Sequence, residues 1–207
     1  ALDSDGAELI RCDIVDNGTG FEGGGVYSEA DLTLIECLVE GNTAAVSGAG
    51  VMAFLGHFRL DSCLIHDNEA VAFGAGVYAS GLASVEIVNT TISGNRLASD
   101  FGGGVGAYID GNASGRLVGC TATGNTGSPG AGILLLNSPT VSVEASIVSG
   151  NMSTTGPSDL IGLSFAPIPS AGFNVVGVSS FFTSVATDVF ATDPLLAPLA
   201  FNGGRTM

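Results

Sequence analysis

One repeat unit of this 207-residue chain reads Leu38-Val39-Glu40-Gly41-Asn42-Thr43-Ala44 and, after three intervening residues, Gly48-Ala49-Gly50-Val51-Met52-Ala53. The asparagine returns at intervals of 25, 26, 27, 30 and 26 residues, as Asn17, Asn42, Asn68, Asn95, Asn125 and Asn151. Between these asparagines stand five glycine triplets, Gly23-Gly24-Gly25, Gly48-Ala49-Gly50, Gly74-Ala75-Gly76, Gly102-Gly103-Gly104 and Gly130-Ala131-Gly132. A period of this size indicates a repeat architecture.

Alignment on the asparagine shows apolar columns with the two-residue alternation that is typical of β-strands. Eight residues before it stand Leu9, Leu34, Leu60, Ile87, Leu117 and Val143. Three residues before it stand Ile14, Val39, Ile65, Ile92, Ala122 and Val148. Five residues before it stand Cys12, Cys37, Cys63, Thr90, Cys120 and Ser146. We expect all three columns to face the interior.

The apolar runs are short, alternating and broken by glycine, which favours strands over paired helices. The repeat therefore predicts an all-β fold, a right-handed single-stranded parallel β-helix of about 7–8 coils with an irregular C-terminal cap. Residues 1–151 are expected to form the β-helix repeats, and residues 152–207, which contain five prolines, the final coils and the capping segment. Both parts are expected to form one continuous domain, a fragment of a longer protein.

The repeat around Asn42 and Gly48 is similar to those of secreted right-handed β-helix proteins, including chlamydial polymorphic outer membrane proteins. Those proteins usually carry phenylalanine three residues before the asparagine, where this chain has isoleucine, valine or alanine. The end of the chain resembles the C-terminal motif of bacterial surface proteins with a choice-of-anchor Q domain, through Asp193-Pro194-Leu195-Leu196-Ala197-Pro198-Leu199-Ala200-Phe201-Asn202-Gly203-Gly204-Arg205-Thr206. The resemblance implies an extracellular or bacterial cell-surface location.

Composition excludes several classes of partner. The chain has 20 acidic residues and 5 basic ones, all arginine, for a net charge of −15. Because phosphate recognition relies on clusters of lysine and arginine, no nucleic-acid partner is expected. No apolar run reaches the roughly 18 residues of a membrane span, so this segment is not expected to insert into a membrane.

The four cysteines share one column and are 25, 26 and 57 residues apart. Stacked neighbours would place their Cβ atoms about 5 Å apart, beyond the roughly 3.5–4.5 Å of a disulfide, so buried free thiols are expected. A zinc site would need paired short spacings, which are absent. The sequence therefore predicts no metal site and no cofactor, and it offers no support for calcium.

The asparagine column has two interpretations. Four segments match the N-glycosylation pattern, namely Asn17-Gly18-Thr19, Asn89-Thr90-Thr91, Asn112-Ala113-Ser114 and Asn151-Met152-Ser153. For Asn17 and Asn151 we favour an inward ladder, because stacked amides can donate to and accept from one another.

Charged residues also fall in register between repeats. Arg59, Glu86 and Arg116 share one outward column, and Arg11 lies one coil below Glu36. Such pairs are expected to hold the register of the coils. His66 is in register with Glu40 and is expected to make a surface contact rather than to act in catalysis.

The strand after each triplet tests an enzymatic function, because lyases and hydrolases of this fold commonly carry outward catalytic residues there. Counting from the triplets quoted above, its outward positions are Tyr27, Met52, Tyr78, Gly106 and Leu134, then Glu29, Phe54, Ser80, Tyr108 and Leu136. A lyase similar to pectate lyases would require several calcium-binding carboxylates and a basic residue as proton acceptor. A glycosidase would require two carboxylates about 5 or 6.5–9.5 Å apart. With one acid among these positions, no catalytic residue is predicted.

This face is instead flat and aromatic, and it is edged by a glycine column, Gly25, Gly50, Gly76, Gly104 and Gly132. We expect ligand contacts at Tyr27, Met52, Tyr78 and Tyr108, since exposed apolar patches often mark contact sites. The interpretation that we weigh more heavily for the same four residues is that the chain's own tail around Phe181 and Phe182 covers this face.

These features favour a non-enzymatic extracellular or cell-surface rod that acts as a stalk, an adhesin or a passenger segment. It would present loops and an aromatic sheet face to a polysaccharide or a cell-surface protein. A polysaccharide lyase or glycoside hydrolase similar to pectate lyases, in active or degenerate form, is the alternative, although fold alone does not imply function. End-to-end self-association is a third expectation, because uncapped coils can template another chain.

Overall fold

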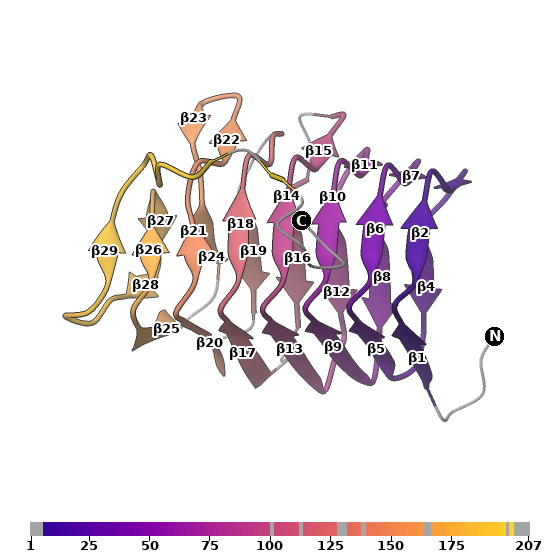
Figure 1. The fold of residues 1–207 in the computed structure, drawn as a ribbon, viewed down its shortest axis with the longest axis horizontal. Coiled ribbons are helices and arrows are strands. Elements are labelled where there is room, and N and C mark those ends of the chain that lie inside the picture. The colour runs from indigo at the N-terminus through magenta and orange to yellow at the C-terminus, as the bar shows by residue number, and fades with distance from the viewer. Residues whose placement is uncertain are drawn as a thin grey trace.

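The structure is a computed structural model that describes residues 6–99, 102–111, 114–127, 132–137, 140–163, 167–197 and 199–200. Four features considered above lie outside these residues: Gly130-Ala131 of the fifth triplet, Asn112-Ala113 of one glycosylation pattern, Pro198, and residues 201–206 of the tail motif. All regular elements within the described residues are β-strands (Figure 1). Among these residues, no helix has the length and apolarity to cross a membrane.

Each of the first four coils contributes strands to four sheets in turn, and later coils contribute to fewer. The first sheet has the order β1 (Ala7–Ile10), β5 (Leu32–Ile35), β9 (His57–Asp61), β13 (Ser84–Val88), β17 (Ser114–Val118), β20 (Thr140–Glu144), β25 (Ile168–Gly172) and β28 (Phe182–Thr183). The second sheet has the order β2 (Asp13–Val15), β6 (Leu38–Glu40), β10 (Leu64–His66), β14 (Thr91–Ser93), β18 (Thr121–Thr123), β21 (Ile147–Val148), β26 (Val175–Val176) and β29 (Val189–Phe190).

The third sheet is short, with the order β15 (Arg96–Leu97), β11 (Glu69–Ala70), β7 (Thr43–Ala44) and β3 (Gly18–Thr19). The fourth sheet has the order β27 (Ser179–Ser180), β24 (Leu160–Leu163), β19 (Ile133–Leu136), β16 (Ala107–Asp110), β12 (Val77–Ser80), β8 (Val51–Phe54) and β4 (Val26–Ser28). A two-stranded antiparallel pair, β22 (Met152–Ser153) and β23 (Gly156–Pro157), projects from the sixth coil.

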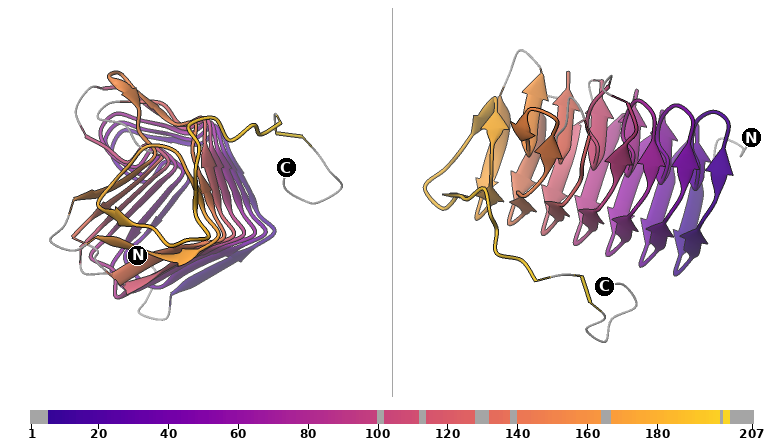
Figure 2. Two further views of the ribbon diagram at one scale, coloured as in Figure 1. Left: turned by 90° about the vertical axis from the view of Figure 1, so that its left-hand side faces the viewer. Right: turned by 90° about the horizontal axis from the view of Figure 1, so that it is seen from above.

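Strands in these four sheets pair in parallel with their counterparts in the coils before and after, as Figure 2 shows in the view along the rod. About six full coils are followed by two shorter ones, β25 to β27 and β28 to β29. The predicted all-β parallel solenoid is thus confirmed, and the estimate of about 7–8 coils includes the two short ones.

The predicted interior columns form the core. Leu34, Leu60, Ile87, Leu117 and Val143 are buried, as are Val39, Ile65, Ile92, Ala122 and Val148. Cys37, Cys63 and Cys120 are buried free thiols, and Cys12 on the first coil is half-buried, which agrees with the predicted role of the cysteine column. Stacking of like side chains through successive coils removes apolar surface from water along the whole rod.

The asparagine column forms the corner between the second and third sheets, and it is the predicted amide ladder. The Nδ2 atom of Asn68 donates to Asn95 Oδ1 over 2.9 Å, and Asn95 Nδ2 donates to Asn125 Oδ1 over 2.9 Å. Asn17 and Asn151 stand at the two ends of the same ladder. Asn151 donates to the buried carboxylate of Asp159 over 2.8 Å, so an acid ends the ladder where the sequence analysis identified none.

The C-terminal part closes the rod and then turns back. Phe182 packs against the core, and its ring centroid lies 6.4 Å from that of Phe190. These short coils form the irregular C-terminal cap. The residues that follow run back along the outside of the second sheet, where Leu196 and Leu199 lie beside Thr91 (Figures 1 and 2).

Candidate functional site

The four predicted contact residues lie in one column of the fourth sheet. Tyr27 pairs with Met52, Met52 with Tyr78, and Tyr78 with Tyr108, on four successive coils. Leu134 continues the column on the fifth coil. The side chains therefore form a single stripe along the rod.

The spacing from the fourth triplet had placed Gly106, not Tyr108, in this column, and that placement is wrong. Val77 N donates to Gly106 O over 2.9 Å, as Val51 N donates to Gly76 O. The structural counterpart of Gly74-Ala75-Gly76 is therefore Gly104-Val105-Gly106, and Gly106, not Gly104, belongs to the glycine column. The residues inserted in this longer repeat lie before the triplet, which is why counting from Gly102 fails.

The corrected register also changes the second outward column. Ser80 pairs with Phe54 and with Asp110, so Asp110 takes the place that was predicted for Tyr108. The two outward columns thus contain two acids, Glu29 on the first coil and Asp110 on the fourth. Three coil spacings separate them, or about 14 Å, which is wider than the roughly 5–9.5 Å of glycosidase carboxylate pairs.

Access to the column differs between its two ends. Tyr27 is 46% exposed, whereas Met52 is 3% and Tyr108 7% exposed. The rings of Tyr78 and Tyr108 are stacked, with centroids 5.2 Å apart and an interplanar angle of 6°. Phe73 covers this pair, since its ring lies 5.2 Å from that of Tyr108.

Each tyrosine hydroxyl is held in its neutral form. A hydrogen bond to Glu29, over 2.6 Å, raises the pKa of Tyr27 to about 12. Burial raises the pKa of Tyr108 to about 12 and also raises the pKa of Tyr78. Within the described residues, the expected cover from the chain's own tail is not observed: Phe182 packs against the core, and Leu196, Ala197, Leu199 and Ala200 lie beside the second sheet.

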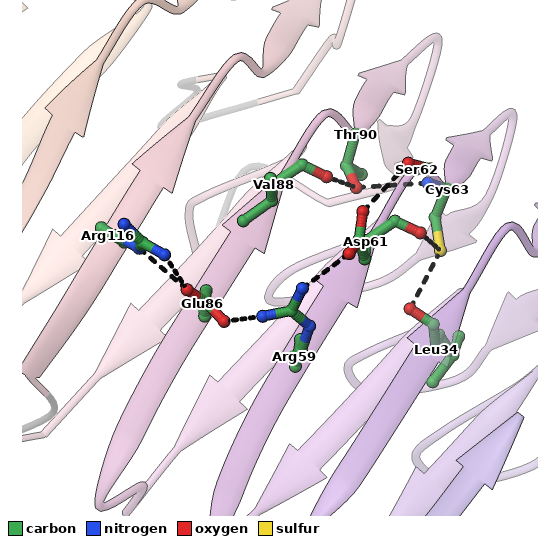
Figure 3. A network of polar contacts seen from close by, with 9 residues as sticks. All are labelled: Leu34, Arg59, Asp61, Ser62, Cys63, Glu86, Val88, Thr90 and Arg116. Atoms are coloured by element: carbon green, nitrogen blue, oxygen red, sulfur yellow. Dashed lines mark hydrogen bonds and ion pairs between the residues drawn. The ribbon is translucent and has the colours of Figure 1, made fainter.

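Charged side chains link adjacent coils of the first sheet, as predicted (Figure 3). Glu86 accepts hydrogen bonds from Arg59 on one side and from Arg116 on the other, the latter over 2.6 Å. The pKa of Glu86 is lowered, chiefly by its hydrogen bond with Arg116. Arg11 donates to Glu36 over 2.8 Å, which confirms the second predicted pair.

A second arrangement of functional groups lies on the second sheet. The returning tail and the outer face of this sheet enclose a groove of about 610 Å³, lined by His66, Asp67, Thr91, Ser93, Gly94, Thr121, Thr123, Gly124, Leu196, Ala197, Leu199 and Ala200. The predicted register of His66 with Glu40 is confirmed. Its predicted surface position is wrong: His66 is only 5% exposed, and it lines the groove that the returning tail forms with the second sheet.

A family model described as Right handed beta helix region matches residues 1–184. The chain belongs to this right-handed β-helix family. No curated protein and no solved structure matches the chain. The match covers the stacked coils and most of the two short ones, so the handedness that the repeat predicted agrees with the family.

In this β-helix, the roles of three residues near the candidate sites were not predicted from the sequence. Phe73 precedes the glycine triplet and gave no signal that it would cover Tyr108. The carboxylate of Asp67 approaches the His66 ring, which depends on the conformation of the corner after β10. Asp159 lies outside the asparagine column, although its carboxylate ends the amide ladder and accepts from both the side chain and the backbone of Asn151.

Proposed function

We propose that this β-helix is a non-catalytic rod of an extracellular or cell-surface protein, where it acts as a stalk, an adhesin or a passenger segment. One observation carries the proposal: each arginine in the described part of the chain donates to a carboxylate on a neighbouring coil. The pairs are Arg11 with Glu36, Arg59 with Glu86, Arg96 with Glu69, and Arg116 with Glu86.

These pairs use the basic side chains to hold adjacent coils in register. Hydrogen bonds to Glu36 and to Asp61 raise the pKa values of Arg11 and Arg59 respectively, which opposes a role for either as a proton acceptor. The resemblance of the tail to choice-of-anchor Q proteins supports a bacterial cell-surface location. The rod can then position loops and side chains at a distance from that surface.

Contact with a partner is proposed at the Tyr27 end of the aromatic column. Tyr27 offers an exposed ring, and Tyr78 is only partly covered. Such rings can stack on a sugar or bury against a protein, so the partner is a polysaccharide or a cell-surface protein. Met52 and Tyr108, which are buried in the same column, would pack beside these rings rather than touch the ligand.

The test is binding to a polysaccharide array by the native chain and by two alanine variants. Tyr27→Ala should reduce binding at least roughly tenfold, as expected for an aromatic contact residue. Phe190→Ala, which removes an exposed ring from β29 on the last coil, should leave binding unchanged. Equal binding by the native chain and Tyr27→Ala would overturn the proposed contact.

A cluster of two carboxylates and an imidazole on the second sheet favours a second candidate, a carbohydrate-active enzyme. The ligand-type atoms of Glu40, His66 and Asp67 lie within 4.8 Å of one another, which brings two carboxylates close to an imidazole. A turnover screen on pectin-like and neutral polysaccharides, with and without calcium, tests this candidate. Turnover that is lost in Glu40→Gln and in Asp67→Asn would establish it and overturn the non-catalytic rod.

A further inference from the structure

His66 has a buried ring nitrogen without a hydrogen-bond partner. One nitrogen, Nδ1, lies 3.1 Å from Asp67 Oδ2. The other, Nε2, is buried and has no hydrogen bond, although Glu40 Oε2 lies 3.4 Å away. Because an unsatisfied buried polar atom is costly, it points to a group that the protein holds at this position.

We propose that His66 Nε2 and Glu40 bind a divalent cation of the zinc class. Imidazole nitrogen and carboxylate oxygen are ligands that zinc accepts together. Two ligand atoms about 2.0–2.1 Å from a tetrahedral zinc ion lie about 3.3–3.4 Å apart. The observed separation of 3.4 Å between Nε2 and Oε2 fits that geometry with little rearrangement.

Asp67 acts as a positioning residue for this site. Its Oδ2 atom accepts the Nδ1 proton of His66, and this hydrogen bond leaves the lone pair of Nε2 free to face Glu40. Metal-binding histidines commonly donate their second ring nitrogen to a carboxylate in this way, which fixes the tautomer and the ring orientation.

The open coordination positions lie on the Glu40 side of the pair, where the Glu40 side chain is 37% exposed. Two protein ligands leave at least two positions of a tetrahedral ion for water or for a bound oxygen ligand. Ser93, Thr91 and Thr123 line the groove on the other side of His66, and Ser93 follows His66 in the column. The net charge of −15 also favours cation binding over anion binding.

The prediction of no metal site rested on the absence of short paired spacings. Here the ligands lie on adjacent coils, and Glu40 and His66 are brought into register by the pairing of β6 with β10. In a solenoid, residues one repeat apart are neighbours across a sheet, so a metal site needs no short motif. The site is separate from the aromatic column on the fourth sheet and does not depend on the function proposed there.

The experiment is a Zn²⁺ titration of the native chain in competition with a chromogenic chelator. The reference chain, called native here, and all variants carry Cys12→Ser, because Cys12 is the half-buried thiol, and excess Mg²⁺ occupies exposed carboxylates. We expect one equivalent of Zn²⁺ to bind. His66→Asn should weaken this binding at least roughly 100-fold, while Asp67→Asn should weaken it roughly 10–100-fold.

His57→Asn is the matched control, since His57 is the other histidine of the chain and its Nδ1 pairs with Ser84 on the first sheet. Glu40→Gln keeps the size of a half-exposed side chain, so it separates loss of metal binding from loss of folding. Circular dichroism should show it folded, and added Zn²⁺ should raise the melting temperature of the native chain but not of Glu40→Gln. No Zn²⁺ uptake by the native chain, or equal uptake by His66→Asn and His57→Asn, would overturn the proposal.

Discussion

Gly76 and Asn95 lie against each other across two coils of the rod. A Cβ atom on Gly76 would stand 3.0 Å from Asn95 Nδ2 and 2.5 Å from the carbonyl oxygen of Gly106. The same relationship links Gly50 with Asn68 and Gly106 with Asn125. The glycine column and the asparagine column, which are separate in the sequence, therefore pack against each other along the rod.

Because of this close packing, we expect Gly76→Ala to lower the stability of the rod strongly. The added methyl group meets backbone and a hydrogen-bonded amide, neither of which can move aside without breaking the ladder. We expect the free energy of unfolding to fall by about 2–3 kcal/mol, as for overpacking of a rigid site. Chemical denaturation monitored by circular dichroism measures it.

Gly20→Ala is the matched control for Gly76→Ala. No heavy atom lies within 4 Å of a Cβ built on Gly20, and its backbone is not in the left-handed region. Its effect on the free energy of unfolding should stay within about 0.5 kcal/mol. Similar losses in the two variants would mean that the contact with Asn95 is not what excludes a side chain from Gly76.

The sequence predicts this fold well because the repeat is strict where coils must stack. The asparagine spacing located the ladder, and the apolar columns located the core. The alignment failed in the longest repeat, since Gly102-Gly103-Gly104 and Gly104-Val105-Gly106 overlap and only hydrogen bonds between coils distinguish them. The burial of His66 and the position of the tail could not be predicted, because both depend on contacts between residues that no periodicity relates.

Asn95→Ala is predicted to destabilise the rod more than a typical substitution. Asn95 Oδ1 accepts hydrogen bonds from the backbone and side-chain nitrogens of Asn68, and Asn95 Nδ2 donates to Ile65 O over 3.0 Å. Removal leaves several buried groups unsatisfied at a cost of about 1–3 kcal/mol each, so the loss should exceed about 3 kcal/mol. Equilibrium unfolding in urea measures this loss.

Asn17→Ala supplies the comparison for Asn95→Ala, because Asn17 is an exposed member of the same column at the first coil. Its side chain donates to Val15 O and Asn42 Oδ1, so its removal leaves fewer buried groups without a hydrogen-bond partner. We expect a loss of about 1 kcal/mol or less. A loss equal to that of Asn95→Ala would contradict the view that burial makes the ladder stabilising.

Asp188 should make the stability of the cap depend on pH. Burial would raise its pKa, but hydrogen bonds from Val185, Ser170 and Asn174 outweigh this effect and lower the pKa below 3.8. A lowered folded-state pKa contributes stability that is present above the unfolded-state pKa and is lost as the pH falls through the folded-state pKa. Melting temperatures recorded from about pH 6 down to about pH 2 should therefore fall in the acidic range.

Asp188→Asn should be less stable than the native chain near neutral pH, because its amide nitrogen cannot accept the hydrogen bond from Val185. This deficit should shrink as the pH falls, because protonation of Asp188 weakens the hydrogen bonds that its carboxylate accepts in the native chain. Asp16→Asn removes one exposed carboxylate and controls for the change in net charge. A deficit of Asp188→Asn that stays constant with pH would refute this linkage.

The cysteine column predicts a two-phase reaction with a thiol reagent. Burial raises the pKa values of Cys63 and Cys120 to about 11, and their Sγ atoms contact the carbonyl oxygens of Leu34 and Ile87. At pH 8 about one such thiol in a thousand is ionised, and burial further blocks access of the reagent. Only half-buried Cys12 should react in the folded rod, and the other three thiols should react after unfolding in guanidinium. Cys12→Ser should abolish the fast phase. Cys63→Ser should leave the fast phase intact and reduce by one the number of thiols that react only after unfolding. A fast phase of more than one thiol in the folded native chain would show that this column is open to solvent.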